Sequence, residues 1–237
     1  MKTRGRLLLI PADLGSDTTD HVWPAGNLSR ISHIRHFIVE NDRTARRFLR
    51  KAGFTASFDD VALLLLNKHT SDKDASGFLD AAEEGHDTGL LSEAGMPCVA
   101  DPGQKVVAMA HRRGIAVVPL VGPGSVLLAL MASGFSGQRF VFHGYLPIDS
   151  KARIRALQAM EREAYRLDQT QIFMETPYRN DQLMKDLLQA CLPGTLLCVA
   201  CDLTLPTEFI RTHPMKEWKK NMPGLHKRPG MFLLFHP

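Results

Sequence analysis

Short, continuous apolar runs recur along the chain and alternate with longer segments that have helical periodicity. Such runs are typical of strands that are covered on both faces, because a half-exposed strand alternates apolar and polar residues. Strands that alternate with helices along a chain indicate helices packed on a sheet. The sequence therefore predicts an α/β fold.

The boundaries of the predicted elements follow from these runs and from their Gly, Pro and Ser punctuation. Strands are predicted at residues 6–10, 36–40, 88–92, 115–120, 140–144, 171–175, 196–200 and 231–235. Helices are predicted at residues 42–51, 75–84, 104–113, 125–133, 151–165 and 180–191. The segment 215–229, rich in Lys, Pro and Gly, is predicted to be a surface loop before the last strand.

A domain boundary is predicted near the middle of the chain. At 237 residues the chain is long enough for one large domain or two small ones. Gly122-Pro123-Gly124 interrupts any regular element, and half of the predicted strands precede it. We therefore expect two α/β domains, residues 1–121 and 122–237.

Charge and hydropathy narrow the class of protein. The 29 basic and 25 acidic residues leave a net charge of +4, which favours a polyanionic partner only mildly. The apolar stretch near the start ends at Pro11 and is too short for a signal peptide. Nowhere does the sequence approach the roughly 20 apolar residues of a membrane helix. We expect a cytoplasmic protein without a membrane partner.

The four cysteines and the histidines give no metal-ligand pattern. Cys198 and Cys201 form a C-x-x-C, but within an apolar run, whereas structural zinc normally needs a second pair and a redox motif usually opens a helix. We therefore predict two buried strand thiols and no metal.

Turns rich in small residues follow three of the predicted strands, at residues 92–103, 121–125 and 176–180. Such turns let the backbone approach a ligand at the carboxyl end of a strand, where open α/β sheets bind their ligands. Ordinary tight connectors need the same residues, so composition alone leaves both interpretations open. The turn at 121–125 lacks the pattern of a phosphate-binding loop.

These turns belong to a series of motifs whose order and spacing carry a resemblance. The motifs are ENDR at 40–43, SEAGMP at 92–97, DPG at 101–103, VGPGS at 121–125, GYLP at 144–147, ETPYR at 175–179 and ACDLT at 200–204. They resemble E-D-T-R, S-D-A-G-T-P, D-P-G, P-G-P-S, G-F-L-P, E-S-P-H-R and A-R-E-L-T of the tetrapyrrole methylase superfamily. Within it, the chain resembles the branch of ribosomal RNA small-subunit 2′-O-methyltransferases that act on a cytidine ribose.

The resemblance implies two α/β domains with S-adenosylmethionine in the cleft between them, usually a homodimer, and RNA as the partner. By position, it implies that the cofactor contacts Pro11, Gly95, Pro97, Val99, Asp101, Gly124, Ser125, Met174, Ala200, Pro229, Gly230 and Met231.

The chain departs from the family at two turns. The family's T-P-I-G-N-L is IPADLG at residues 10–15, and its K-G-E is KRPG at residues 227–230. The small helical extension that many relatives carry after the final strand has no counterpart either. We expect a divergent subgroup.

Residues that act on the substrate are predicted only as candidates. Carboxylates at strand ends are candidate general bases, although each is equally suited to capping a turn; they are Asp13, Glu40, Asp101 and Glu175. The basic helix predicted at 42–51 is a candidate for binding RNA through Arg43, Arg46 and Arg47. The same arginines could instead form an ordinary solvent-exposed helix face. Tyr178 and Arg179 are candidate substrate contacts, although Arg179 could equally pair with Glu175.

Three functions remain open from the sequence. The first is an S-adenosylmethionine-dependent methyltransferase that acts on the ribose 2′-O of a cytidine in small-subunit ribosomal RNA. The second is a tetrapyrrole methylase of the precorrin or uroporphyrinogen type, in which the same basic residues would bind the acidic macrocycle. The third is a cofactor-binding module with weak catalysis, which the altered turn after the first strand favours.

Overall fold

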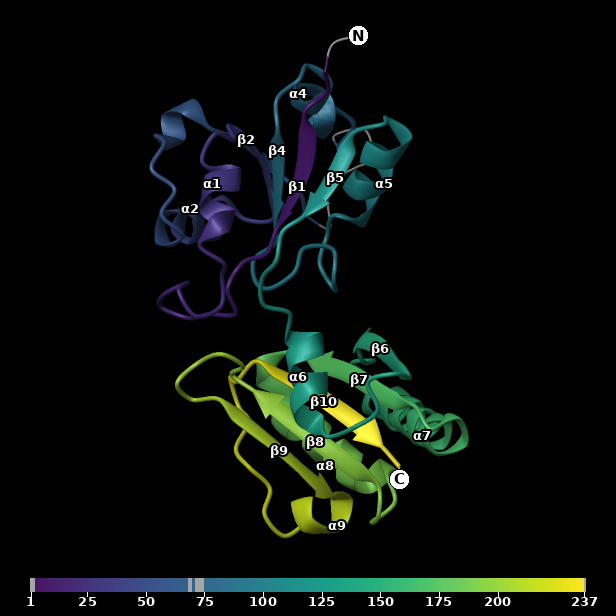
Figure 1. The fold of residues 1–237 in the computed structure, drawn as a ribbon. Coiled ribbons are helices and arrows are strands. Elements are labelled where there is room, and N and C mark those ends of the chain that lie inside the picture. The colour runs from purple at the N-terminus through teal and green to yellow at the C-terminus, as the bar shows by residue number, and fades with distance from the viewer. Residues whose placement is uncertain (1–2, 68–69, 71–74, 237) are drawn as a thin grey trace. The chain divides into compact units, whose positions relative to one another are not determined.

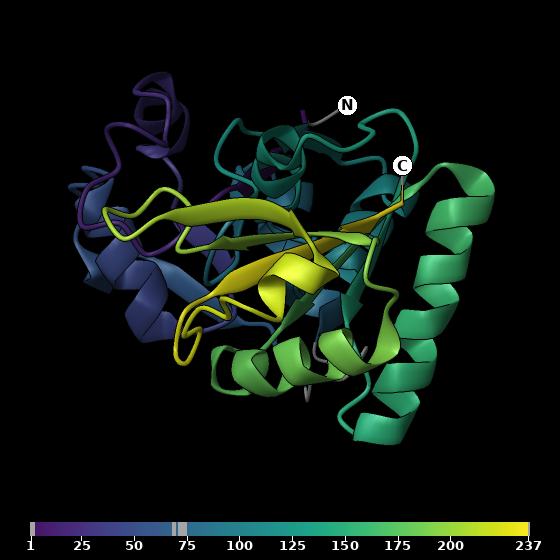
Figure 2. The ribbon, with the colours of Figure 1, turned by 90° about the horizontal axis from the view of Figure 1, so that it is seen from below.

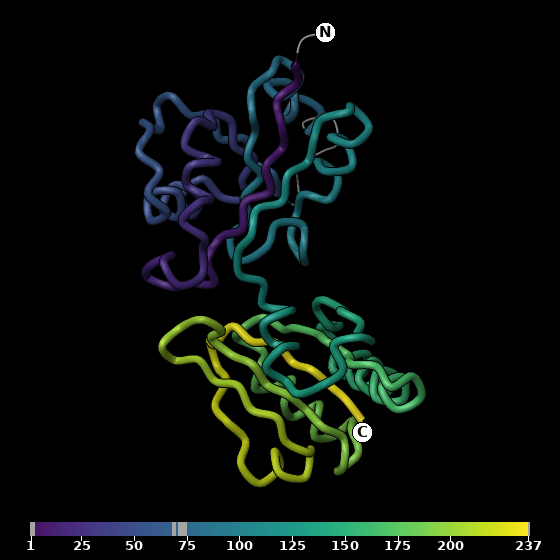
Figure 3. Tube along the Cα trace, viewed as in Figure 1, coloured from purple at the N-terminus to yellow at the C-terminus, as the bar shows by residue number. Residues whose placement is uncertain are grey.

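The structure, a computed structural model, describes residues 3–67, 70 and 75–236. The chain divides into two compact units, Met1–Gly124 and Ser125–Pro237. Figure 3 follows the chain through the first unit and then the second. Each unit is built on its own five-stranded sheet and has α/β architecture, as the sequence predicted.

The sheet of the first unit is parallel throughout, in the order β3-β2-β4-β1-β5. Parallel strands need crossover connections, and helices supply most of them here. The strands are β1 (Arg6–Ile10), β2 (His36–Val39), β3 (Ala62–Leu65), β4 (Thr88–Leu91) and β5 (Ala116–Pro119). The helices are α1 (Gly26–Ile31), α2 (Asp42–Lys51), α4 (Asp80–Glu83) and α5 (Gln104–Arg112), with 3-10 turns η1 (Phe58–Asp60) and η2 (Ser76–Leu79).

Helices cover both faces of this sheet: α1 and α2 lie on one side of the strands, and α5 lies on the other (Figure 1). Successive strand residues point to opposite faces, so β1 supplies both layers of the core. Leu8 packs in a buried cluster with Leu49 of α2, whereas Leu7 packs with Val106 of α5. Burial on both faces explains the continuous apolar runs of the sequence.

The sheet of the second unit is mixed, in the order β6-β7-β10-β8-β9. Only β6 and β7 are parallel, and β10 runs antiparallel to both β7 and β8. The strands are β6 (Phe140–Tyr145), β7 (Thr170–Glu175), β8 (Leu196–Cys201), β9 (Phe209–Pro214) and β10 (Gly230–Phe235). The helices are α6 (Ser125–Ser133), α7 (Ser150–Leu167), α8 (Asn180–Ala190) and α9 (Met215–Trp218), with the 3-10 turn η3 (Pro177–Arg179).

The second sheet is also covered on both faces, because α8 and α6 lie on opposite sides of it (Figure 2). Leu157 of α7 and Leu187 of α8 join a buried cluster with Phe232 of β10. The core of this unit is therefore separate from that of the first unit.

Most predicted elements are confirmed, and the differences have local causes. The helix predicted at 75–84 is instead η2 followed by the short α4. The surface loop predicted at 215–229 begins with α9, because Met215 and Trp218 are buried. The edge strands β3 and β9 were not predicted; β9 carries Arg and His among its apolar residues. Among the described residues, no helix has the length and apolar character needed to span a bilayer.

The C-x-x-C prediction is also confirmed: Cys198 and Cys201 are buried, free thiols in β8. Burial raises the pKa of Cys201 to about 12, so this thiol stays protonated and packs as an apolar group. Across the described ranges, no group of His, Cys, Asp and Glu side chains is arranged to hold a metal ion.

A buried ion pair joins α7 to α8. Arg153 and Asp186 are each 3% exposed, and Arg153 Nε donates to Asp186 Oδ2 at 2.7 Å. Arg153 also donates to the carbonyls of Pro147 and Ile148. The guanidinium therefore ties the chain entering α7 to α8.

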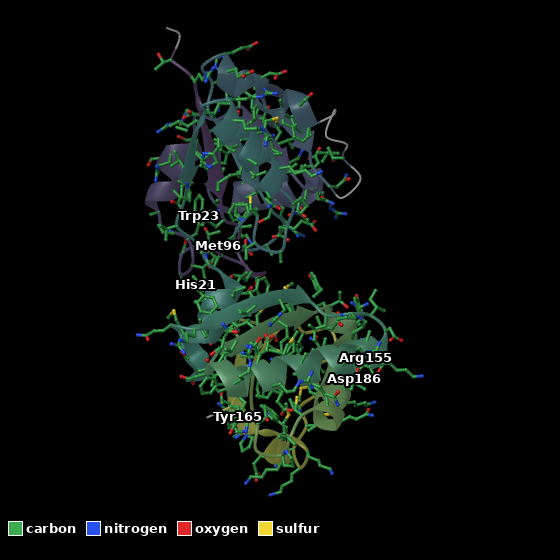
Figure 4. The ribbon with its side chains drawn as sticks, turned by 90° about the vertical axis from the view of Figure 1, so that its right-hand side faces the viewer. His21, Trp23, Met96, Arg155, Tyr165 and Asp186 are labelled. Atoms are coloured by element: carbon green, nitrogen blue, oxygen red, sulfur yellow. The ribbon has the colours of Figure 1, made fainter. Side chains whose placement is uncertain are left out.

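Replacement of Arg153 should therefore destabilise the second unit strongly. Arg153→Ala leaves the Asp186 carboxylate buried without its cation, which costs about 3–5 kcal/mol. Arg155→Ala, an exposed arginine on the same helix (Figure 4), should cost under about 0.5 kcal/mol. Urea unfolding followed by circular dichroism measures both, and equal midpoints for the two variants would contradict the assignment.

Candidate functional site

The turns that the sequence singled out in the first unit follow β1, β4 and β5, and Glu40 directly follows β2. These strands are neighbours in a parallel sheet, so their carboxyl ends meet at one edge. The turns after β1, β4 and β5 therefore lie together at the edge where open α/β sheets bind ligands.

The turns after β1 and β4 are joined by two main-chain hydrogen bonds. The amide of Ala12 donates to the carbonyl of Gly95 at 2.9 Å, and the amide of Gly95 donates to the carbonyl of Asp13 at 3.3 Å. Gly95 has φ +68°, a left-handed conformation that glycine adopts without strain. This pair fixes the spacing of the two turns.

Glycine lets the turn after β5 pack closely on the other two. A Cβ on Gly122 would lie 2.5 Å from Cβ of Pro11, and one on Gly124 would lie 3.0 Å from the side chain of Met96. Small residues are thus required here for turn-to-turn packing.

Two side chains from the segment before and within α1 hold these turns. Trp23 Nε1 donates to the carbonyl of Pro11 at 3.0 Å, and Asn27 Nδ2 donates to the carbonyl of Val121 at 2.7 Å. Both side chains are buried, and Trp23 packs edge-to-face on Phe48 of α2. Figure 4 labels Trp23 and Met96 at this end of the unit. Sequence analysis missed Trp23 and Asn27, because a lone Trp and a lone Asn carry no motif.

Three acidic side chains follow β2 and β4. The amide of Glu93 donates to Glu40 Oε1 at 3.3 Å, and Thr44 Oγ1 donates to Glu93 Oε1 at 3.3 Å. Burial raises the pKa of Glu40 to about 7, and the nearby charge of Asp101 adds to this effect. Burial likewise raises the pKa of Asp101 to about 6, against the lowering effect of its hydrogen bond with Ser92. Glu40 and Asp101 therefore each change protonation state near neutral pH.

Asp13, the acid that distinguishes the first turn, is neutralised. Lys51 Nζ at the end of α2 lies 2.5 Å from Asp13 Oδ2 and donates to the carbonyl of Ser16 at 2.6 Å. The amide of Gly15 donates to Asp13 Oδ1 at 2.8 Å. Both carboxylate oxygens are thus occupied, and Asp13 fastens this turn to α2.

The other predicted cofactor residues of the first unit lie in the same turns. Pro11 and Pro97 are buried, whereas the side chain of Val99 is 44% exposed. Cys98 and Ala100, on either side of Val99, have positive φ, so this turn is tightly wound.

In the second unit the strand ladder brings predicted cofactor residues together. Met231 of β10 pairs with Met174 of β7 on one side and with Ala200 of β8 on the other. Gly230 pairs with Glu175 in the next rung, and the carbonyl of Pro229 accepts the amide of Asp202. Ser125 begins α6.

Glu175 and Arg179 pair with each other, the alternative that the sequence left open. The carboxyl of Glu175 is fully buried; its Oε1 accepts from the Arg179 guanidinium and, at 2.7 Å, from the amide of Thr176. Glu175 Oε2, Arg179 Nε and Asn180 Oδ1 are buried without a hydrogen-bond partner among the described residues. The pair binds Arg179 to its own turn.

The basic helix α2 presents two kinds of arginine. Arg46 pairs with Asp42, and its guanidinium lies 4.8 Å from the centre of the Phe58 ring, which Arg50 also covers at 4.3 Å. Arg43 and Arg47 lie four residues apart on the exposed face, and within the described ranges neither makes an ion pair or a side-chain hydrogen bond. These two are therefore the available cations of the helix.

Tyr178 is exposed on the surface of the second unit. The residue is 69% exposed, and its ring makes an edge-to-face contact with His226 at a centroid distance of 5.9 Å. Lys227, also exposed, follows His226. Tyr178 is therefore accessible to a partner, whereas Arg179 is occupied.

This arrangement can be compared with known proteins. Residues 26–218 match the family model described as Tetrapyrrole (Corrin/Porphyrin) Methylases. The chain belongs to this family. It is accordingly a methyltransferase, and the methyl donor is S-adenosylmethionine.

Curated relatives of this tetrapyrrole methylase are named Ribosomal RNA small subunit methyltransferase I. The one from Escherichia coli O157:H7 is 30% identical over 98% of this chain and 77% of its own length. The one from Vibrio cholerae is 32% identical over 89% of this chain and 69% of its own length. That from Halalkalibacterium halodurans is 34% identical over 70% of this chain and 57% of its own length.

Solved structures of the family share the fold. The methyltransferase CobJ superposes with a TM-score of 0.64 at 17% identity, over 98% of this chain and 94% of its own. A uroporphyrin-III C-methyltransferase from Thermus thermophilus, complexed with S-adenosylhomocysteine, gives 0.59 at 15% identity, over 98% and 97%. At these identities the likeness establishes the fold alone.

The buried acids predict a pH-dependent stability. The folded-state pKa values of Glu40 and Asp101 lie above their ordinary values, so the folded protein binds more protons than the unfolded chain. Their contribution to the free energy of unfolding is full at pH below about 4 and is lost as pH rises through about 6 to 7.

Glu40→Gln should therefore flatten the fall of Tm between pH about 5 and about 8. Glu163→Gln, at an exposed glutamate of α7, is the matched control and should follow wild type. Calorimetric scans at each pH measure the effect. Parallel profiles for wild type and Glu40→Gln would contradict the burial of this carboxyl.

Proposed function

We propose that this methyltransferase methylates RNA, at the ribose 2′-hydroxyl of a cytidine in the small ribosomal subunit. The observation that carries the proposal is the 30% identity to the Escherichia coli small-subunit methyltransferase over 98% of the chain. Two unpaired arginines on the exposed face of α2 are suited to the phosphates of such a substrate.

The residues of the first unit fit the cofactor chemically. S-adenosylmethionine carries a sulfonium cation, which a carboxylate attracts, and ribose hydroxyls, which donate hydrogen bonds to a carboxylate. Asp101 supplies such a group without a cationic partner among the described residues, whereas Asp13 is paired with Lys51. The bound cofactor supplies an electrophilic methyl group.

The main chain at the carboxyl edge of the first sheet contributes the rest of the proposed cofactor contacts. Pro11, Gly95, Pro97, Val99 and Gly124 lie in turns whose small residues leave the backbone accessible to a ligand. In the second unit, the proposed contacts are Ser125, Met174, Ala200, Pro229, Gly230 and Met231, most of which are gathered by the strand ladder.

RNA contacts the chain through α2 and the exposed face of Tyr178. Arg43 and Arg47 bind phosphates, and the exposed ring of Tyr178 offers a stacking surface for a base. Arg46 supports the helix through Asp42 and Phe58, and Arg179 supports its own turn, so both contribute to substrate binding indirectly.

Two copies of the chain associate in this proposal, and the enzyme acts in the cytoplasm, where ribosomal subunits are assembled. The outer face of α6 is apolar: Leu127 and Met131, one turn apart, are 48% and 79% exposed. Apolar side chains exposed in this way favour burial against a second copy. Light scattering coupled to size-exclusion chromatography determines the number of chains.

Gly95→Ala should weaken the binding of S-adenosylhomocysteine about tenfold. An alanine at φ +68° costs about 1–2 kcal/mol, and its Cβ would lie 3.2 Å from Leu14 Cδ2, so the turn must shift. Gly137→Ala, where an added Cβ meets nothing within 4 Å, is the matched control. Titration calorimetry measures both affinities; equal affinities in folded variants would place the cofactor elsewhere.

Arg43→Ala/Arg47→Ala should lower RNA affinity and flatten its salt dependence by up to about two units in a log-log plot, because each lost phosphate contact removes roughly one unit. A charge-matched control is Arg112→Ala/Arg166→Ala, at exposed arginines of α5 and α7. Methyl transfer from labelled S-adenosylmethionine to unmethylated small ribosomal subunits, across a salt series, is the measurement. If the enzyme transfers labelled methyl groups to a tetrapyrrole acid but never to RNA, the substrate is a tetrapyrrole and the proposal is wrong. If it transfers label to no acceptor, the chain is a cofactor-binding module.

A further inference from the structure

Methylation of a hydroxyl requires a group that takes its proton. A ribose hydroxyl is a weak nucleophile, and a positioned base accelerates its attack by about 10²–10⁴-fold. The present inference rests on the proposed function, because a hydroxyl acceptor must lose its proton as it is methylated. The sequence left four carboxylates as candidates, and their surroundings in the structure separate them.

Two of the four carboxylates are already compensated. Asp13 accepts from Lys51 and from the amide of Gly15, one partner on each oxygen. Glu175 is fully buried and accepts from Arg179 and from the amide of Thr176. A carboxylate that is bound to a cation holds a proton poorly, because protonation would break the ion pair.

Asp101 is more available but is tied to its own turn. It hydrogen-bonds the hydroxyl of Ser92, at the carboxyl end of β4, and this bond favours its charged form. Asp101 lies in the D-P-G turn whose residues are proposed to contact the cofactor. These features suit a contact to the cofactor better than the acceptance of a proton from the substrate.

Glu40 has the features that a proton acceptor needs. It follows β2 and is half-buried at the carboxyl edge of the sheet, beside the turn after β4. The amide of Glu93 holds its Oε1, and Oε2 makes no hydrogen bond with any described residue. No Lys or Arg among the described residues pairs with it, so its charge is uncompensated. One oxygen is thus fixed while the other remains open to a partner.

We propose that Glu40 is the general base, which takes the proton of the attacking hydroxyl through Oε2. The hydroxyl oxygen forms a bond to the methyl carbon as the bond from that carbon to sulfur breaks. The bonding pair passes to sulfur, which leaves as neutral S-adenosylhomocysteine, and the proton remains on Glu40 until it passes to water. Charge balances: one sulfonium and one carboxylate become a thioether and a carboxylic acid.

The acidic neighbours tune this base. After burial, the charge of Asp101 has the largest effect and raises the pKa of the Glu40 carboxyl; the hydrogen bond from the Glu93 amide lowers this pKa, and the charge of Glu93 raises it by less. A general base must be ionised at the working pH and must also have a high proton affinity, so it is most effective when its pKa is close to that pH. The pKa of Glu40, about 7, meets both requirements near neutral pH. Asp101 is therefore a positioning residue for this function, through its charge.

The first test compares the kinetics of Glu40→Gln, Glu40→Asp and the control Glu163→Gln on small ribosomal subunits. Glu40→Gln should lower kcat about 100-fold or more with KM changed less than about threefold, because the base acts only in the chemical step. Wild-type kcat/KM, which reports the free enzyme, should rise with pH to a plateau with a midpoint near 7, a transition that Glu40→Gln lacks. Glu40→Asp should retain the transition at reduced rate.

The second test needs no substrate. Carbon-13 NMR of side-chain carboxyls should show a glutamate, assigned by its loss in Glu40→Gln, that titrates near 7 in wild type and at lower pH in Asp101→Asn. A Glu40 that titrates at its ordinary value overturns the inference. So does an unchanged kcat in a Glu40→Gln variant that still binds S-adenosylhomocysteine. If the wild-type enzyme transfers no label to RNA, the proposed function itself is wrong, whatever the pKa of Glu40.

Discussion

The two main-chain hydrogen bonds between Ala12, Gly95 and Asp13 set the geometry of the carboxyl edge of the first sheet. They join turns that lie more than eighty residues apart in the chain, and the turn after β5 packs on them through Gly122 and Gly124. Because the partners are backbone groups, their positions depend on strand register rather than on side-chain rotamers. A ligand that binds this edge therefore meets a surface that is already organised.

In each of the two units, charge near the carboxyl ends of the strands is compensated unevenly. Asp13 and Glu175, each at the end of a strand, are held by Lys51 and Arg179. Glu40 and Asp101 lack such partners among the described residues, and burial raises the pKa of both. Burying an ionisable carboxyl group without a cation lowers the stability of the fold. Carboxyl groups with pKa values raised in this way are therefore typical of functional sites.

Much of the architecture was predictable, because burial on both faces leaves continuous apolar runs and parallel strands require crossovers. The misses occurred where sequence signals were weak. The edge strand β9 mixes polar with apolar residues, and α9 is recognisable only because Met215 and Trp218 enter the core. The helix expected at 75–84 divides into a 3-10 turn and one α-turn, a boundary that periodicity does not resolve.

The sequence alone determined the family, the fold class and which residue types follow each strand, because motif order and the spacing of small residues are properties of the chain itself. Tertiary structure decided which of those residues are chemically free. Arg46 and Arg43 look alike in sequence, yet only Arg46 meets Asp42 and Phe58. Likewise, Asp13 and Glu40 both follow strands, but only folding brings Lys51 to Asp13 and leaves Glu40 with a backbone amide. A proton affinity depends on neighbours within a few ångströms, and those neighbours are distant in the chain.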